Sequence, residues 1–295
     1  MRWRLLGLRT LVALLARLSL PASHRLGAAL GWLAWKANRR PARISRKNIA
    51  RCLPELTEAG REALVRDSLI ETGKTIAETG ALWRWPRERL EPLVREIVGR
   101  DHLDRAMAGG KGAILLGPHL GAWELGGLYS DRLYPATILY RPPRQPELEE
   151  AVVKARARFG ARLVPASTRG VRALLAALRR GELVAILPDQ EPSFGQGVFA
   201  PFFGHPAYTL LLVAGLLRRT GATAVMGYME RLPGGQGYRL HYLPAPEAVA
   251  DPDPVIAATA LNQGVERCVR ALPRQYQWSY RRFRRAERAG LLSSD

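Results

Sequence analysis

Cysteine is scarce in this chain, and no residue spacing suggests a bound metal. The 295 residues contain two cysteines, Cys52 and Cys268, which lie too far apart for a metal-binding or redox motif. Isolated cysteines of this kind are typical of packed thiols in a reducing compartment, and they argue against a disulfide framework. The five histidines show no zinc-type spacing, so we expect no metal and no other cofactor.

Acidic residues are missing from the first 54 positions, which contain twelve Lys or Arg. The segment 267–288 holds eight Arg and one acidic residue, Glu287. These two segments account for the whole formal net charge of +19, so the rest of the chain is neutral. We therefore expect an ordinary domain with two ends that bind something anionic. The many aliphatic residues and Trp among the N-terminal Arg favour an anionic membrane surface over nucleic acid.

The N-terminal segment also lacks an uncharged apolar run of the roughly 20 residues that a transmembrane helix needs. Arg9 and Arg17 interrupt it. On a helix these two and Arg2 fall on one side, and the opposite side carries Leu8, Leu11, Leu14, Leu15 and Leu18. This pattern predicts an amphipathic helix lying in the membrane interface. A core helix with a basic edge, a secretory signal and a transit peptide remain alternatives, and whether the helix spans the membrane stays open.

The first 95 residues are predicted to be helical, over 3–20, 23–38, 42–52 and 58–82. From Lys111 onward, short apolar runs alternate with helical stretches. The strands are expected at 113–116, 137–140, 162–164, 183–187, 224–229 and 238–243. The later helices are expected at 122–130, 146–159, 169–180, 207–219 and 254–271.

This alternation predicts an α/β fold with a central sheet flanked by helices. The Pro- and Gly-rich turn at 233–237 joins the last two strands, which we expect to be antiparallel, so the sheet should be mixed. We assign residues 1–40 to N-terminal amphipathic, membrane-associating helices. Residues 41–295 are assigned to a single α/β domain.

One histidine stands where an α/β sheet places its ligands. His119 lies just past the strand expected at 113–116, among the turn residues Gly117, Pro118 and Gly121. Glu124 follows five residues later. On one helix the two side chains would point about 140° apart. We therefore expect His119 in a loop and Glu124 in the first turn of the next helix, bending back to hold the imidazole. Such a pair can act as a general base towards a hydroxyl. A buried structural histidine is the alternative.

Three further residues are candidates for substrate binding at the same edge of the sheet. Arg141 follows a strand and precedes two prolines, which suits a phosphate or oxyanion site better than a surface charge. Asp189 follows the strand at 183–187, and it either belongs to the site or only caps a turn. Arg169 begins a helix, where it either binds substrate or is merely exposed.

The density of arginine in the chain's last basic segment argues against a folded network of ion pairs. The residues are Arg281, Arg282, Arg284 and Arg285. We expect them to face acidic headgroups, lipid phosphates or an acidic protein. An ordinary solvated face is the alternative.

The stretch Gly117-Pro-His119-Leu-Gly-Ala-Trp-Glu124 resembles the HxxxxD/E block of glycerolipid acyltransferases. Its form is that of the lipid A biosynthesis (late lauroyl/myristoyl) acyltransferase family, within the lysophospholipid acyltransferase superfamily. Further stretches are similar to this family in the same order, and they run over nearly the whole chain. They are Asn48–Leu56, Tyr140-Arg-Pro142, Arg169-Gly170, Leu187-Pro-Asp-Gln190 with Gly197–Gly204, and Gln275–Phe283.

The resemblance implies transfer of a fatty acyl chain at the cytoplasmic face of a bacterial inner membrane. The donor would be an acyl thioester on acyl carrier protein or coenzyme A, and the acceptor a hydroxyl of a phosphorylated lipid A precursor. His119 would be the base and Glu124 its partner, with no covalent acyl-enzyme. Loop N–H groups near Gly121, or Arg141, are the oxyanion candidates. A related acyltransferase acting on another glycolipid or lysolipid is the alternative. Tyr280 departs from the family, since many members carry His there.

Overall fold

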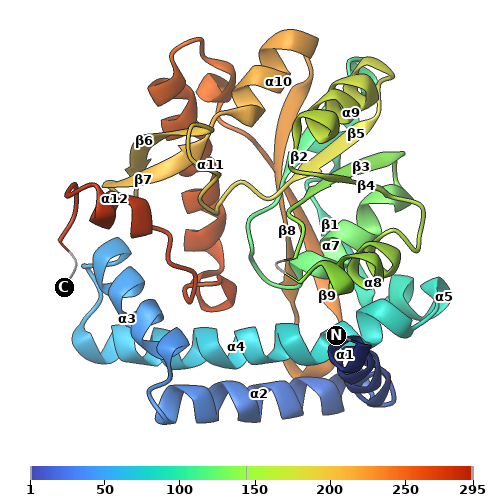
Figure 1. Cartoon of the computed structure of the whole chain (residues 1–295), viewed down its shortest axis with the longest axis vertical. Helices are drawn as coiled ribbons and strands as arrows, with labels where there is room; N and C mark the ends of the chain where they lie inside the picture. The colour runs from blue at the N-terminus through green and yellow to red at the C-terminus, as the bar shows by residue number, and fades with distance from the viewer. Residues whose placement is uncertain (1, 144, 294–295) are drawn as a thin grey trace.

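A layer of helices formed by the first part of the chain lies along one edge of the molecule (Figure 1). The computed structural model describes residues 2–143 and 145–293, and it leaves the side chains of Arg2 and Arg4 undescribed. The layer consists of α1 (Arg2–Leu15), α2 (Leu20–Lys36), α3 (Arg40–Cys52) and α4 (Glu58–Arg84). All four predicted N-terminal helices are confirmed. Whether residues 1–40 form a unit apart from the rest stays a prediction.

Helix α1 is shorter than predicted, and its apolar face is divided. It ends at Leu15, and Ser19 then caps α2 by accepting a hydrogen bond from the Ala22 amide. Leu11 and Leu14 are exposed as expected, whereas the predicted face also included Leu8, Leu15 and Leu18, which are half-buried. The side chain of Arg2 lies outside the described residues. Within the described part of the chain, no helix is both long and apolar enough to cross a bilayer.

Helices α2 and α4 approach each other until their backbones touch. A Cβ atom on Gly27 or Gly73 would collide with the backbone of the other, and one on Gly31 would collide with the backbone around Leu69. Because glycine alone permits this approach, the two helices pack as one rigid layer.

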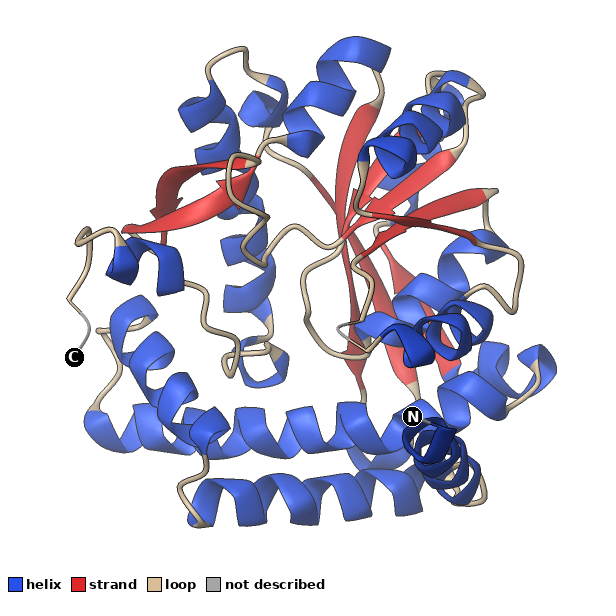
Figure 2. Ribbon diagram, in the orientation of Figure 1, coloured by secondary structure: helices blue, strands red, loops and turns tan. Residues whose placement is uncertain are grey.

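A seven-stranded mixed sheet forms the centre of the molecule (Figure 2). Its strands in spatial order are β1 (Val94–Val98), β9 (Tyr238–Pro244), β8 (Thr223–Arg231), β2 (Ala113–Leu116), β5 (Leu183–Ile186), β3 (Ala136–Tyr140) and β4 (Arg162–Pro165). The last five of these run in one direction, and β9 and β1 run in the other. The predicted antiparallel pairing of the last two strands is confirmed. The carboxyl ends of five parallel strands therefore meet at one edge.

Helices cover both faces of the sheet. One face, which buries Leu116, Ile186 and Met226, packs against α9 (Thr168–Arg179), α10 (Leu212–Thr220) and α11 (Pro254–Ala271). The opposite face buries Ala185 and Val225 beneath α6 (Arg100–Ala108), α7 (Trp123–Tyr129) and the end of α4. The remaining helices are α5 (Arg87–Leu90), α8 (Pro146–Arg156), α12 (Arg284–Arg288) and the 3-10 turns Glu91–Leu93, Ser130–Arg132, Pro233–Gly235, Glu247–Ala250 and Pro273–Gln275.

The predicted α/β class and every predicted strand are confirmed, but some elements were not foreseen. Helix α6, the edge strand β1 and a separate hairpin were not predicted. The hairpin is formed by β6 (Gly197–Phe202) and β7 (His205–Leu210). The helix predicted over 207–219 is wrong at its start, since residues 207–210 belong to β7. Prolines within β6 and β7 weaken the strand pattern, and the short two-stranded sheet tolerates them because it has only edges.

A buried ion pair fastens the helical layer to the sheet. Glu78 of α4 is fully buried, and its carboxylate accepts hydrogen bonds from Arg231 of β8 at 3.0 and 2.5 Å and from Tyr238 of β9 at 2.9 Å. His24 of α2 contacts the same carboxylate at 3.0 Å. Burial alone would raise the pKa of Glu78, but the charge of Arg231 and the bonds from His24 and Arg231 outweigh it and lower the pKa to about 2.

We expect Glu78→Gln to lower the free energy of unfolding by about 3–5 kcal/mol, because it leaves the buried Arg231 charge without its main partner. Since the folded-state pKa lies below the ordinary value of 4.5, the stabilisation is complete above that pH and is lost as pH falls towards 2. The difference between wild type and variant in urea unfolding should therefore shrink over this range. Glu55→Gln, at an exposed ion pair with Arg270, is the control and should cost less than about 1 kcal/mol. An equal loss in both variants would contradict the account.

Candidate active site

The register of two neighbouring strands brings His119 and Asp189 together. Strands β2 and β5 are parallel, and Leu116 pairs with Ile186. His119 and Asp189 each follow three residues later, and each comes after a proline, Pro118 or Pro188. The Gly117 amide continues the ladder by donating to the Ile186 carbonyl at 3.0 Å. The two loops thus leave the sheet side by side, and their side chains meet beyond the strand ends.

Asp189 holds His119 through two hydrogen bonds. The imidazole Nδ1 lies 2.8 Å from Asp189 Oδ1, and the His119 amide donates to Oδ2 at 3.0 Å. Burial alone would raise the pKa of Asp189, but the electrostatic attraction of His119 and its hydrogen bonds outweigh burial and lower this pKa. Because an ionised carboxylate only accepts, the geometry assigns the imidazole proton to Nδ1 and leaves Nε2 as an acceptor.

The Nε2 side of the imidazole is turned towards an open space. The His119 side chain keeps 14% of its surface exposed, whereas that of Asp189 keeps 3%. The amide nitrogen of Gln190 lies 3.2 Å from Nε2 and also donates to Gln277 at 3.4 Å. The ring of Trp123 packs beside the imidazole, with centroids 5.0 Å apart. The arrangement presents one basic nitrogen and shields the carboxylate behind it.

The expected contact between Glu124 and His119 is wrong. Glu124 does lie in the first turn of α7, but its carboxylate accepts hydrogen bonds from Arg156 of α8 at 2.7 and 2.9 Å. The Trp83 indole of α4 donates to it as well, at 2.9 Å. The reason is topological: the β2–β5 pairing already places Asp189 behind the ring, and α7 turns Glu124 towards α4 and α8.

Gly121 does not offer its amide to a substrate, so this oxyanion candidate is also wrong. Its N–H donates to the Gln275 carbonyl at 3.0 Å, and the Ala122 N–H donates to the Met229 carbonyl at 2.7 Å. The residue has φ +62°, and a Cβ there would collide with the Met229 carbonyl. Glycine is therefore needed at this position for backbone conformation and close packing.

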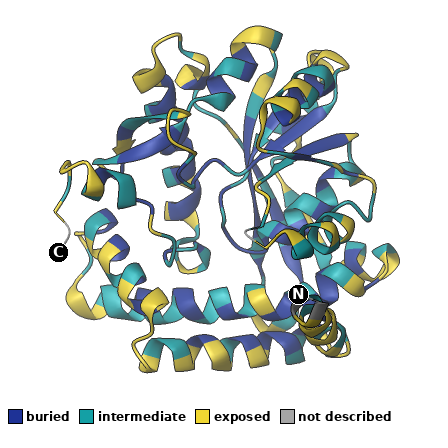
Figure 3. Cartoon of the chain, viewed as in Figure 1, coloured by how far each residue is buried: buried dark blue, intermediate teal, exposed yellow. Residues whose placement is uncertain are grey.

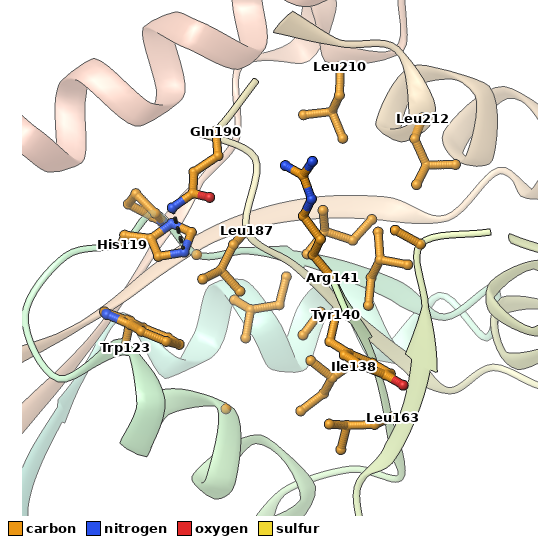
Figure 4. A pocket seen from close by; sticks show the side chains of 18 of the residues that line it. His119, Trp123, Ile138, Tyr140, Arg141, Leu163, Leu187, Gln190, Leu210 and Leu212 are labelled. Atoms are coloured by element: carbon orange, nitrogen blue, oxygen red, sulfur yellow. Dashed lines mark hydrogen bonds between the residues drawn. The ribbon is translucent and has the colours of Figure 1, made fainter. Parts of the chain in front are cut away.

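A cavity of about 960 Å³ opens in front of His119 (Figure 4). It lies between α7 and one face of the sheet, and it continues to the ends of β3 and β4. The apolar lining includes Leu115, Ile138, Leu163, Leu187, Met229 and Leu240. The polar lining includes His119, Glu124, Arg141, Arg156 and Gln190. A large apolar space with a few convergent polar groups suits a ligand with a long hydrocarbon part.

The two arginines predicted to bind substrate lie in different environments. Arg141 follows β3 and lines the cavity, and Figure 4 shows its side chain pointing into the space near Gln190 and Leu212. Arg169 is exposed in the first turn of α9, where its neighbours Ser167 and Thr168 line the cavity instead. Sequence reasoning missed Arg156, which sits 32 residues beyond Glu124 in a helix without a motif.

The last basic segment is largely structural, contrary to expectation. Arg282 is buried and donates to the Tyr208 carbonyl and the Thr209 hydroxyl, both at 2.8 Å. Arg284 pairs with the buried Glu191 at 3.2 Å. These arginines are thus dense because they tie the end of the chain to β7 and to the loop after β5. Arg281 keeps an exposed pair with Glu287.

The first and last of the resembling stretches meet in space. The Asn48 amide of α3 donates to the carbonyls of Trp278 and Tyr280, both at 2.7 Å. The Tyr280 hydroxyl accepts a hydrogen bond from the Glu191 amide at 3.0 Å, which ties the closing stretch to the loop after β5. Cys52 and Cys268 are buried and unpaired with each other, as expected, and burial raises the pKa of each thiol.

Comparisons with known proteins bear on this site. A curated relative, the lipid A biosynthesis lauroyltransferase of Escherichia coli (strain K12), is 31% identical over 272 residues, which cover 92% of this chain and 88% of the relative. The lipid A biosynthesis palmitoleoyltransferase of the same strain is 30% identical over 269 residues, with 91% and 87% covered. The phosphatidylinositol mannoside acyltransferase of Mycobacterium tuberculosis (strain CDC 1551 / Oshkosh) is 29% identical over 202 residues, with 66% and 63% covered.

The family comparison covers the site and nearly all of the fold. The model of the family described as bacterial lipid A biosynthesis acyltransferase matches residues 2–285. This span includes both loops that form the His119–Asp189 pair, and it confirms the resemblance drawn from the sequence. The chain belongs to the bacterial lipid A biosynthesis acyltransferase family.

Proposed function

We propose that this acyltransferase moves a fatty acyl chain from an acyl thioester to a hydroxyl of a lipid A precursor, with His119 as the general base. Acyl carrier protein is the expected donor. The observation that supports this mechanism is the environment of the His119 imidazole. Its Nδ1 lies 2.8 Å from Asp189, and its Nε2 lies at the wall of a large apolar cavity. No cofactor takes part.

The reaction needs only a proton acceptor and a site for the developing charge. The acceptor hydroxyl replaces the Gln190 amide at Nε2 and gives its proton to the imidazole. Its oxygen attacks the thioester carbonyl and forms a tetrahedral oxyanion. When this intermediate collapses, the carbon–sulfur bond breaks and the thiolate takes the proton from the imidazolium. Asp189 stabilises the imidazolium between these steps.

Two arginines are proposed to stabilise the negative charges of the reaction. Arg156 lines the cavity, and Glu124 fixes its guanidinium through Nε and Nη2, so its other N–H donors can bind the oxyanion. Glu124 then acts as a positioning residue for Arg156. Arg141 sits at the other side of the cavity and is proposed to bind a phosphate of the acceptor. Arg169, exposed beside the opening, is the weaker candidate for the same headgroup.

The helical layer is proposed to bind the cytoplasmic face of the inner membrane. Large apolar side chains are exposed on α1 and α2, and exposed residues follow the outer side of α2 (Figure 3). They are Trp3, Leu6, Leu11, Leu14, Leu26, Leu30, Trp32 and Leu33. The acid-free basic residues of the first 54 positions accompany them, which is the combination that interfacial helices use.

A second acceptor is the alternative, because a mycobacterial relative is named as a phosphatidylinositol mannoside acyltransferase. Mass spectrometry of lipid A from cells with and without this gene distinguishes the two. A missing secondary acyl chain supports the lipid A precursor, and an intact lipid A with a changed glycolipid or lysolipid supports the alternative.

We expect His119→Ala to lower the acyl-transfer rate by about 10²–10⁴, the usual effect of losing a general base. The measurement is transfer from acyl carrier protein or acyl-CoA to purified lipid A precursor in detergent micelles. His102→Ala, on α6 outside the cavity lining, is the control and should leave the rate unchanged. An unchanged rate in His119→Ala would overturn the mechanism.

For the membrane surface, we expect Leu11→Gln with Leu14→Gln to reduce binding to vesicles of phosphatidylethanolamine and phosphatidylglycerol by more than about tenfold, because each buried Leu contributes about 1.5–3 kcal/mol. The control pair is Val255→Gln with Ile256→Gln on α11, which is similarly exposed. Flotation measures the bound fraction. Equal losses in both pairs, or none in the first, would place the membrane contact elsewhere.

A further inference from the structure

Helix α7 contributes two adjacent glycines to the lining of the cavity. Gly126 and Gly127 both line the cavity, and α7 carries them directly after the Trp123 and Glu124 turn. Each glycine in the interior of a helix is destabilising relative to alanine, because it loses more backbone freedom on folding. Neither has a positive φ, so backbone conformation does not require glycine here.

Close packing does not require glycine at these positions either. A Cβ on Gly126 would have as its nearest neighbour the Met229 Cβ at 3.9 Å, and one on Gly127 would have the Ile138 Cδ1 at 3.9 Å. Both are ordinary van der Waals contacts. The situation differs from that of Gly27, Gly73 and Gly121, where a Cβ would collide with backbone. What glycine provides at 126 and 127 is therefore empty space between the helix and the sheet.

This space is apolar, and the residues that line it towards β9 are deeply buried. Met229 belongs to β8 and Ile138 to β3, so the two glycines face the sheet on either side of β2, the strand that leads to His119. Beyond β8, the lining residues Leu240 and Tyr242 of β9 are almost completely buried. A hydrocarbon chain that starts at His119 can thus extend beneath α7 towards the buried Leu240 and Tyr242.

We propose that Gly126 and Gly127 are specificity-determining residues that set the length of the acyl chain carried by the donor. This inference rests on the proposed function, because it places the thioester carbonyl at His119 and the chain beneath α7. Side chains at these two positions would occupy the room of the terminal methylenes. Each methylene that no longer fits costs about fourfold in affinity, following the transfer free energy of a buried CH₂.

The test compares Gly126→Ala, Gly126→Leu, Gly127→Ala and Gly127→Leu with wild type. Donors are acyl carrier protein loaded with chains from octanoyl to palmitoyl, and the readout is the rate profile against chain length. In parallel, binding of free fatty acids of the same lengths is followed by Trp fluorescence. Gly215→Ala is the matched control: Gly215 is a helical glycine of α10 outside the cavity lining, with no atom within 4 Å of its added Cβ.

We expect both profiles to move to shorter chains, more for Leu than for Ala, while octanoyl transfer is retained and the control keeps the wild-type profile. Thermal unfolding checks folding, and the Ala variants should be at least as stable as wild type because alanine favours helix. Unchanged profiles in folded variants would overturn the inference and leave the proposed function intact. If wild type transfers no chain at all, the proposed function fails, and the fatty-acid binding profile alone decides whether the glycines limit chain length.

Discussion

The parallel pairing of β2 with β5 is the constraint on which the site depends. Its register sets Leu116 opposite Ile186, and matched three-residue steps through Pro118 and Pro188 then place an imidazole against a carboxylate. Everything else around the pair follows from where these two loops leave the sheet. The closing segment packs against the same loops, since the Gln277 amide donates to the His119 carbonyl at 3.1 Å and Glu191 joins Arg284. Backbone hydrogen bonds thus hold the two loops in place, and Asp189 holds the imidazole of His119 between them.

Residues near the carboxyl end of β8 connect the helical layer to the site. Strand β8 carries Arg231, which binds Glu78 of α4, and two residues earlier it carries Met229, whose carbonyl accepts from the Ala122 amide. The Trp83 indole of α4 also reaches Glu124. The surface of α1 and α2 that we propose binds the membrane is in this way connected to α4 and, through it, to the cavity wall. The rigid packing of α2 on α4 by their glycines keeps the cavity at a constant position relative to that surface.

Sequence patterns correctly predicted buried strands, which are short apolar runs, and helices with a capping residue at their start. Strand β2 and helix α11 have the predicted bounds, and the loop position of His119 followed from helix geometry. The hydrogen-bond partner of His119 was harder to predict, because the order of the strands in the sheet cannot be read from local sequence patterns. Asp189 was predicted to lie at the correct edge of the sheet, but nothing in the sequence favoured it over Glu124 as the partner. Nearness in sequence favoured Glu124, but α7 turns it to Arg156. Strand β1 was not predicted, because Arg95 and Glu96 interrupt the alternation of apolar and polar residues. An edge strand tolerates such charged residues.

The measurement that tests this arrangement most directly is the NMR signal of the His119 Nδ1 proton. A proton shared with a carboxylate resonates far downfield, and selective ¹⁵N-histidine labelling with substitution of the other histidines assigns it. We expect the signal to be present in wild type, to persist in Glu124→Gln and to be lost in Asp189→Asn, because Asp189 Oδ1 lies 2.8 Å from Nδ1. Loss of the signal in Glu124→Gln together with its persistence in Asp189→Asn would contradict this arrangement.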